Sequence, residues 1–267
     1  MKAASVHKAL GVFNMLVVLF IAAPLIFVVA VAFTPTERLA LPPGGQLSLR
    51  WFEALIHNQG FVKAFIRSCY LAVSAASIST TIGVLGAFGI VRHKFKYRNI
   101  LETLFISPLT IPAAVLGLAL LQFFLFLGWY DRFVSMLAAH VVVTIPYVIR
   151  VVGGSLQGVD EQYELAAQNL GATWFQVLSR VTVPLIRTAI LAGFLFAFLI
   201  SFDNVTVSMF VAGMNTETLP IRMFNHVQDI NDPLIAAVST ALILLAVGAV
   251  VVFEQLLGLQ KLFRPTE

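Results

Sequence analysis

The long apolar runs of this chain limit its fold more than any other feature. A bilayer core about 30 Å thick needs roughly 20 helical residues to cross it, and six stretches are close to or above that length. They span approximately residues 10–33, 68–91, 104–128, 133–149, 188–213 and 234–253. We therefore predict an all-α integral membrane protein in which residues 1–267 form one transmembrane domain of six helices.

The overall composition supports a membrane protein. Hydrophobic residues make up 59% of the chain and charged residues 11%, whereas about one quarter of a soluble protein is charged. The sequence pI near 9.4 would fit a nucleic-acid partner, but the basic residues lie at the ends of apolar runs, where they orient a protein in the membrane. The one cysteine, Cys69, excludes an internal disulfide and a cysteine-cluster metal site.

The basic residues predict the orientation. With the N-terminus inside, eleven of the 17 Lys and Arg residues fall on inner segments and six on outer ones, which favours cytoplasmic N- and C-termini. Ala30-Val31-Ala32 resembles a signal-peptide cleavage site, but the preceding apolar run is too long for a signal peptide. We therefore expect an uncleaved first helix.

Residues 158–186 (Gly158–Ile186) form a polar segment, on the cytoplasmic side in this orientation. Asp160 is suited to cap a helix, Glu161 places a carboxylate in its first turn, and Gly171 is suited to the left-handed residue that ends it. An ordinary loop helix between spans would carry the same caps.

A second helix is predicted in the same segment. Thr173 and Gln176 have the spacing of a capping box, in which each side chain bonds the backbone of the other residue. We expect this helix to run from Trp174 to about Thr182 and to stop before Pro184.

The fifth run contains polar residues, notably Ser201, Asp203, Asn204 and Thr206. An ionised carboxylate at the centre of a span costs about 2.5 to 3.5 kcal/mol, so Asp203 should face protein or water. It can line a passage for a cationic solute, or it can bond polar groups of a neighbouring helix. The sequence leaves both roles open.

The third and fourth runs contain prolines, which break the helical hydrogen-bond ladder. Pro108 and Pro112 lie in the third run and Pro146 in the fourth, so we expect kinks there. His140 has no second His or Cys at metal spacing, and we interpret it as a packed, hydrogen-bonded residue.

Small residues recur every four positions in the second run, at Ala75, Ser79, Gly83 and Ala87. Such a stripe lets another helix approach closely.

Motifs of catalysis are absent from the sequence. No segment reads G-x-x-x-x-G-K-[ST], so ATP hydrolysis, if ATP is used, must belong to another subunit. No nucleophile elbow or zinc motif is present either. We predict that this chain is not an enzyme.

The polar segment resembles the EAA loop of ABC importer permeases, which reads Glu-Ala-Ala, three residues, Gly, nine residues, Ile, one residue, Leu-Pro. The residues on this pattern are Ala166, Ala167, Gly171, Val181, Val183 and Pro184, with Val in place of both Ile and Leu. Leu165 stands where the family has Glu, and the nearest carboxylate is Glu164. The runs SFDNVTVSMFVAG and TLPIRMF look like those of the polyamine (spermidine/putrescine) group of these permeases. The resemblance covers essentially the whole chain.

The resemblance implies a type I importer permease in a bacterial inner membrane, with coupling helices between its fourth and fifth spans. Its expected partners are a second six-helix permease of different sequence, two cytoplasmic ATPase subunits that hold ATP and Mg, and a periplasmic substrate-binding protein. It implies membrane lipid around the chain, no cofactor on it and no nucleic-acid partner.

The resemblance also implies roles for individual residues. The residues expected to couple to the ATPase are Glu164, Ala166, Ala167, Gly171, Thr173 and Pro184. Those expected along the pathway are Ser201, Asp203, Asn204 and Thr206. The expected solute is a polyamine or similar organic cation, whereas related permeases carry ferric iron, phosphonates or opines.

Two other functions stay open at this point. An ATP-independent carrier or channel would use the polar segment for regulation, although such carriers usually contain several buried ionisable groups and Asp203 is the only carboxylate within the runs. A membrane scaffold without a pathway is the other. ATP-dependent uptake and co-purification with an ATPase would separate the importer from both.

Overall fold

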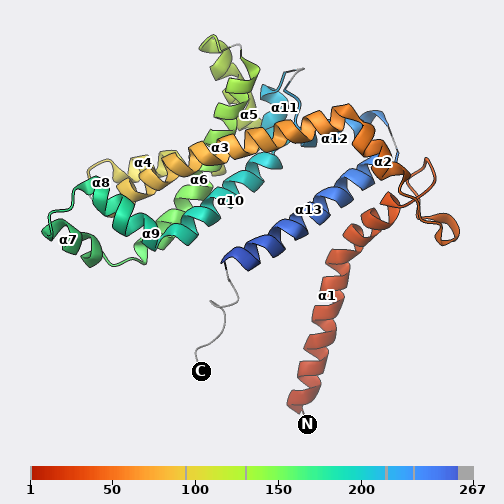
Figure 1. Cartoon of the computed structure of the whole chain (residues 1–267), viewed down its shortest axis with the longest axis horizontal. Coiled ribbons are helices and arrows are strands. Elements are labelled where there is room, and N and C mark those ends of the chain that lie inside the picture. The colour runs from red at the N-terminus through yellow and green to blue at the C-terminus, as the bar shows by residue number, and fades with distance from the viewer. Residues whose placement is uncertain (1, 94, 130, 214–215, 231, 258–267) are drawn as a thin grey trace. The chain divides into compact units, whose positions relative to one another are not determined.

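The computed structural model describes residues 2–93, 95–129, 131–213, 216–230 and 232–257, and within these ranges every regular element is a helix (Figure 1). The elements are α1 (Lys2–Ala32), η1 (Pro43–Gly45), α2 (Arg50–His57), α3 (Gln59–Arg92), α4 (Arg98–Ile106), η2 (Ser107–Leu109), α5 (Ala113–Phe126), α6 (Arg132–Gln157), α7 (Gln162–Asn169), α8 (Trp174–Val177), η3 (Leu178–Thr182), α9 (Val183–Leu185), α10 (Arg187–Phe202), α11 (Thr206–Val211), α12 (Leu219–Asp229) and α13 (Leu234–Leu257). The predicted all-helical class is confirmed for these residues. Lys94, Lys261 and Arg264, which contribute to the predicted inner charge, lie outside them.

The spans differ in part from the predicted six. By length and composition, three helices can each cross a membrane, namely Leu10–Ala32, Gln59–Arg92 and Arg132–Gln157. Two bent pairs raise the number to five within the described residues: Arg98–Leu109 with Ala113–Phe126, bent by 108°, and Trp174–Leu185 with Arg187–Phe202, bent by 78°. The last apolar run contains the shorter helix Leu234–Gly248.

The predicted third run, 104–128, is therefore not one straight helix. Pro112 is the N-cap of α5, with φ −54° and ψ 131°, and a proline lacks the N–H that would continue the preceding helix. It also disfavours helical geometry at the residue before it. α4 and α5 therefore meet at a sharp bend, whereas α6 continues through Pro146.

The predicted fifth run, 188–213, is broken as well. α10 ends at Phe202 and α11 begins at Thr206, with Asp203, Asn204 and Val205 between them. The polar residues of this run therefore lie at and beside a break in the helix.

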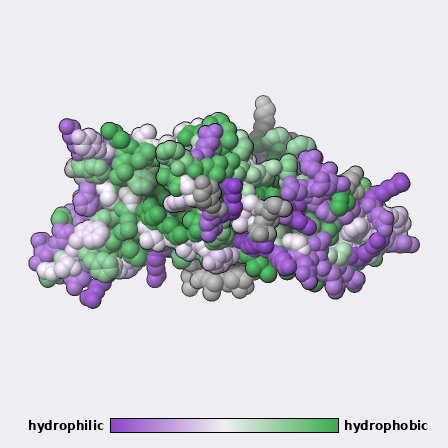
Figure 2. Space-filling view, turned by 90° about the horizontal axis from the view of Figure 1, so that it is seen from above, coloured by the Kyte–Doolittle hydropathy of each residue, from purple (hydrophilic) through white to green (hydrophobic). Residues whose placement is uncertain are grey.

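The chain divides into two compact units, residues 1–62 with 223–267, and residues 63–222. The prediction of a single domain over 1–267 stays a prediction. In the first unit α13 contacts both α1 and α2. Only 11% of the most apolar window of α1 is buried inside the chain, as expected for a helix that faces lipid. Hydrophobic side chains also cover much of the face seen in Figure 2.

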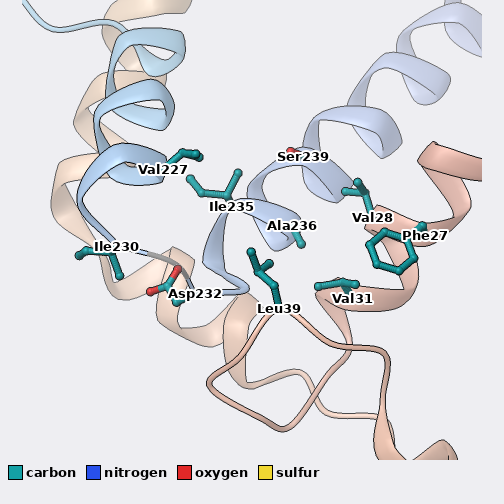
Figure 3. Close-up of a pocket in the computed structure, with 10 residues that line it drawn as sticks. All are labelled: Phe27, Val28, Val31, Leu39, Val227, Ile230, Asp232, Ile235, Ala236 and Ser239. Carbon is teal, nitrogen blue, oxygen red and sulfur yellow. The ribbon is translucent and has the colours of Figure 1, made fainter.

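The first unit contains a mainly apolar hollow between α1, α13 and the end of α12 (Figure 3). Its lining includes one carboxylate, that of Asp232, which is already used within the fold. One of its oxygens lies 2.9 Å from Nε2 of His226 and accepts the backbone N–H of Leu234 at 3.1 Å, at the start of α13. The hollow therefore presents mainly hydrocarbon to whatever occupies it.

In the second unit, α6 packs against α10, and α3 packs against α6 through its small residues. A Cβ built on Gly83 would lie 2.6 Å from Cγ1 of Val148, too close for any side chain. Ala75, Ser79 and Ala87 are fully buried. The small-residue stripe is thus confirmed as a packing face.

Candidate functional site

The first helix of the polar segment (residues 158–186), which we call the coupling loop, is α7. Its C-terminal end forms as predicted, whereas its N-cap is Glu161 and not Asp160. An Oδ1 atom of Asp160 accepts the backbone N–H of Gln162 at 2.9 Å. At the other end Gly171 has φ +87°, and the N–H of Ala172 donates to the carbonyl of Ala167 at 3.0 Å. This is the hydrogen bond of a left-handed glycine cap, so the direction in which the chain leaves α7 is fixed by Gly171.

The capping box at the start of α8 is also confirmed. The backbone N–H of Thr173 donates to Oε1 of Gln176 at 2.8 Å, and the N–H of Gln176 donates to Oγ1 of Thr173 at 3.4 Å. Two backbone groups that a helix start leaves unpaired are thereby satisfied.

The helix that follows corrects one expectation. It does not stop before Pro184 but continues through the π-helical turn η3 into α9, which ends at Leu185. Proline lacks the N–H that would donate to the preceding turn of the helix. The π-helical turn in front of Pro184 alters the backbone hydrogen-bond pattern in that region, and the helix continues past it. The bend into α10 falls instead at Ile186, which has φ −103° and ψ 13°.

Glu164 is directed into the protein and not toward the exposed surface of α7. Its Oε1 lies 3.1 Å from Nε of Arg92, and the two side chains are 9% and 7% exposed. The hydroxyl of Thr182 donates to the same oxygen at 3.0 Å. A buried carboxylate needs such partners, and here they come from the end of α3 and from η3.

Arg92 also bonds the connection between α6 and α7. One of its terminal nitrogens donates to the carbonyl of Val159 at 2.8 Å, and the other lies 3.6 Å from the exposed carboxylate of Glu161. The guanidinium of Arg92 therefore joins α3 to Val159 and Glu161, the residues that lead from α6 into α7. Sequence analysis counted Arg92 only among the basic residues of the inner segments and gave it no separate role.

The outer surface of α7 and α8 is apolar. Leu170 is 90% exposed, and Tyr163, Leu165 and Phe175 are also exposed. Ala166 and Gly171 lie on the exposed surface with them, while Ala167 is half-buried. Exposed apolar side chains on an otherwise polar loop indicate a docking surface. The EAA pattern did not identify these side chains, because they lie between its fixed positions.

The four predicted pathway residues separate into two groups. Asp203, Asn204 and Thr206 line an open hollow beside the break, together with Phe202 and with Ala113 at the start of α5. Ser201 instead is buried, and its hydroxyl lies 2.7 Å from Nδ1 of His140. Three of the predicted residues therefore share one surface, and the fourth, Ser201, is buried and bonded to His140.

The hollow contains a carboxylate. Asp203 is exposed, and among the described residues no Lys, Arg or His pairs with it. It follows directly on the C-terminus of α10, where helix carbonyls carry partial negative charge. Within the described residues, no group of three or more His, Cys, Asp or Glu could hold a metal ion.

The contact between α5 and α11 depends on a glycine that sequence analysis missed. A Cβ on Gly117 in α5 would lie 2.7 Å from the ring of Phe210 and 3.1 Å from Cα of Val207, both in α11. α11, which follows the break, can therefore pack directly on α5.

Comparison with known proteins agrees with this arrangement. Residues 79–260 match the family described as "Binding-protein-dependent transport system inner membrane component". The chain is 33% identical over 245 residues to the spermidine/putrescine transport system permease protein PotC of Haemophilus influenzae, covering 92% of this chain and 94% of that one. It is 34% identical over 238 residues to the putrescine transport system permease protein PotI of Escherichia coli K12, covering 86% and 84%.

A solved structure supports the fold. The chain superposes on one chain of a bacterial ABC transporter involved in the import of the acidic polysaccharide alginate, with a TM-score of 0.74 and 15% sequence identity. The match covers 99% of this chain and 98% of the other. At this identity the match concerns the fold.

Proposed function

The chain belongs to the family of binding-protein-dependent transport system inner membrane components, and from that premise we propose that it forms the pathway for a small organic cation of the polyamine type. It is a multi-pass, non-catalytic permease subunit of an ABC importer. The cation, the pathway residues and the coupling residues are the parts that we propose.

The observation that carries the proposed solute class is the exposed carboxylate of Asp203. It lies in the hollow beside the break, without a cationic partner among the described residues, and Phe202 lines the same hollow. A carboxylate, helix carbonyls and an aromatic face all attract an ammonium group. The names of the relatives PotC and PotI, which refer to spermidine and putrescine, support the same class. A phosphonate would meet a repulsive charge at this point.

The coupling loop is our proposed joint to the ATPase. Leu170 and Phe175 present apolar surface outward for docking, while Glu164 faces inward onto Arg92. A displacement of docked α7 would therefore reach α3 through this ion pair. It would reach α10 through η3 and α9, which lead directly into that helix. Such coupling requires that docking differ between the inward-facing and outward-facing states.

The proposed assembly contains a second six-helix permease of different sequence, two cytoplasmic ATPases and a periplasmic binding protein. ATP and Mg bind to the ATPases. The coupling loop then lies in the cytoplasm, as the distribution of Lys and Arg predicts, with both chain termini on the same side.

The test is uptake by the complete complex reconstituted in proteoliposomes with its loaded binding protein. We expect putrescine or spermidine to accumulate only when ATP is present on the side of the coupling loop. Accumulation without ATP would instead support a carrier or channel. ATP-dependent uptake of an anion alone would leave the importer in place and contradict the proposed solute class.

A further inference from the structure

One buried histidine connects the two helices on either side of the break in the fifth run. His140, in the middle of α6, is 1% exposed. Its Nδ1 lies 2.7 Å from the hydroxyl of Ser201 in α10, and its Nε2 lies 2.9 Å from the hydroxyl of Ser208 in α11. The residues between these two serines include Asp203. The importer function proposed above assigns no role to His140.

The hydrogen bonds around the ring have a fixed direction. The hydroxyl of Ser208 donates to the carbonyl of Asn204 at 2.5 Å. A hydroxyl has one hydrogen, so Ser208 must accept from His140, and Nε2 carries the proton. In the neutral ring Nδ1 is then the acceptor, and Ser201 donates to it. The bonds therefore run from Ser201 through the imidazole and Ser208 to the backbone of the break.

The histidine is itself held in place by neighbouring hydroxyls. Oγ1 of Thr144, one turn further along α6, donates to the carbonyl of His140 at 2.7 Å. The hydroxyl of Ser79 in α3 lies 2.5 Å from Oγ1 of Thr144. Because the Thr144 hydrogen is already used, Ser79 is the donor. We call the five residues His140, Ser201, Ser208, Thr144 and Ser79 the His140 cluster. It joins α3, α6, α10 and α11.

The residue types at the break do not by themselves enforce it. Residues 203–205 contain neither proline nor glycine. Val205 has φ −88° and ψ −51°, in the helical region, whereas Asp203 has φ −87° and ψ 0°, outside it. Two hydrogen bonds converge on Asn204 inside the break: its carbonyl accepts the hydroxyl of Ser208, and its Oδ1 accepts the backbone N–H of Val207 at 3.0 Å.

We propose that His140 is a positioning residue that holds α10 and α11 apart at Asn204 and so keeps Asp203 and Thr206 facing the hollow. It does not touch the solute. This inference rests on the proposed function, because the break matters for transport only if the carboxylate that it exposes, that of Asp203, attracts the solute. A histidine that only fills the core would be replaceable without any effect on the hollow.

The first test measures the geometry of the break independently of transport. Thr206→Cys is introduced in a Cys69→Ala background, since Cys69 is the only native cysteine, and the full complex is treated with a cationic methanethiosulfonate reagent. We expect His140→Leu to change the labelling rate at position 206 by about tenfold, as for the loss of one or two buried hydrogen bonds. His140→Gln, whose amide offers one acceptor and one donor, should keep the native rate.

A matched control separates this effect from general loosening. Leu191→Cys lies on an exposed part of α10 away from the break, and its labelling should be the same in all three backgrounds. If His140→Leu prevents assembly, Ser208→Ala replaces it. That variant removes only the hydroxyl between the ring and Asn204, and the same change at position 206 is expected. Unchanged labelling at position 206 in the assembled variants would overturn the proposal.

The second test is a double-mutant cycle in polyamine uptake. If His140 acts by positioning Asp203, the loss caused by Asp203→Asn should disappear in the His140→Leu background and persist with His140→Gln. Additive losses would overturn the proposal. If Asp203→Asn alone has no effect while the labelling at position 206 still responds to His140→Leu, the His140 cluster holds the break as inferred, and the proposed pathway role of Asp203 is refuted.

Discussion

The guanidinium of Arg92 lies 3.1 Å from the carboxylate of Glu164, and the pair joins the last turn of α3 to the first turn of α7. Removing one partner of a buried ion pair leaves an unpaired charge and costs about 3 to 5 kcal/mol. Arg92→Ala and Glu164→Leu should therefore lower both the thermal stability of the complex and its ATP-dependent uptake. Glu161→Gln is the matched control, because this exposed carboxylate is 3.6 Å from Arg92 and contributes about 1 kcal/mol at most.

The double variant Arg92→Leu, Glu164→Leu tests whether charge or shape matters at this contact. Replacing both members of a buried pair by apolar residues is often neutral for stability. We expect stability to recover toward that of the native complex, as measured by thermal unfolding. Recovery of stability without recovery of uptake would mean that the ion pair itself transmits movement. A double variant as unstable as the worse single variant would contradict the assigned pairing.

Gly171→Val should uncouple the ATPase from transport. At φ +87° a side chain with a Cβ is strained by about 1 to 2 kcal/mol, although no atom lies within 4 Å to obstruct it. The chain would then leave α7 in another direction and move the capping box at Thr173. Gly171→Asn is the control, since asparagine enters the left-handed region more readily. Co-purified ATPase and ATP-dependent uptake are measured together, and native values of both for Gly171→Val would refute the role of this cap.

Leu170→Glu should weaken binding of the ATPase without disturbing the loop. Leu170 is 90% exposed, so its replacement leaves no cavity, whereas a charge on an apolar docking surface is unfavourable. Gln168→Glu adds the same charge at another exposed position of α7 and serves as the control. The amount of ATPase retained by the purified permease is the measurement. Equal retention in both variants would place the docking surface elsewhere.

Asp203→Asn should reduce uptake of a divalent polyamine by roughly three- to tenfold, the range expected for one partly solvated charge interaction. The half-saturation concentration or the maximal rate should change while the amount of assembled complex does not. Glu53→Gln removes an exposed carboxylate from α2 and should leave uptake unchanged. Raising the salt concentration should reduce the difference in uptake between the native complex and Asp203→Asn, because salt screens the charge of the native carboxylate. Identical uptake kinetics in Asp203→Asn would remove this residue from the pathway.

The local features of the loop could be predicted from the sequence because each depends on residues a few positions apart. The left-handed Gly171 and the capping box of Thr173 and Gln176 both depend on backbone groups within one turn, whereas the start of α7 was placed one residue too early. Asp203 could be identified because a carboxylate within an apolar run requires polar surroundings.

The contacts that assemble these features could not be predicted in the same way. Arg92 and Glu164 are 72 residues apart, and His140 and Ser201 are 61 apart, so only the packed fold brings them together. The inward direction of Glu164 could not be predicted, because the EAA pattern gives the positions of residues along the chain and not the side of α7 on which they lie. The break after Phe202 was missed because residues 203–205 contain neither proline nor glycine, and because the histidine that bonds the serines on either side of it lies on another helix.

The π-helical turn at Leu178–Thr182 has a consequence for the rotation of one helix relative to the next. A π-turn holds one more residue than a regular turn, and one residue corresponds to about 100° around a helix axis. The angular offset between the docking surface and α10 thus depends on the number of residues in this turn. Substitution of the exposed Ser179 or Arg180 should be tolerated, whereas inserting or deleting a single residue would turn the docking surface away from its partner.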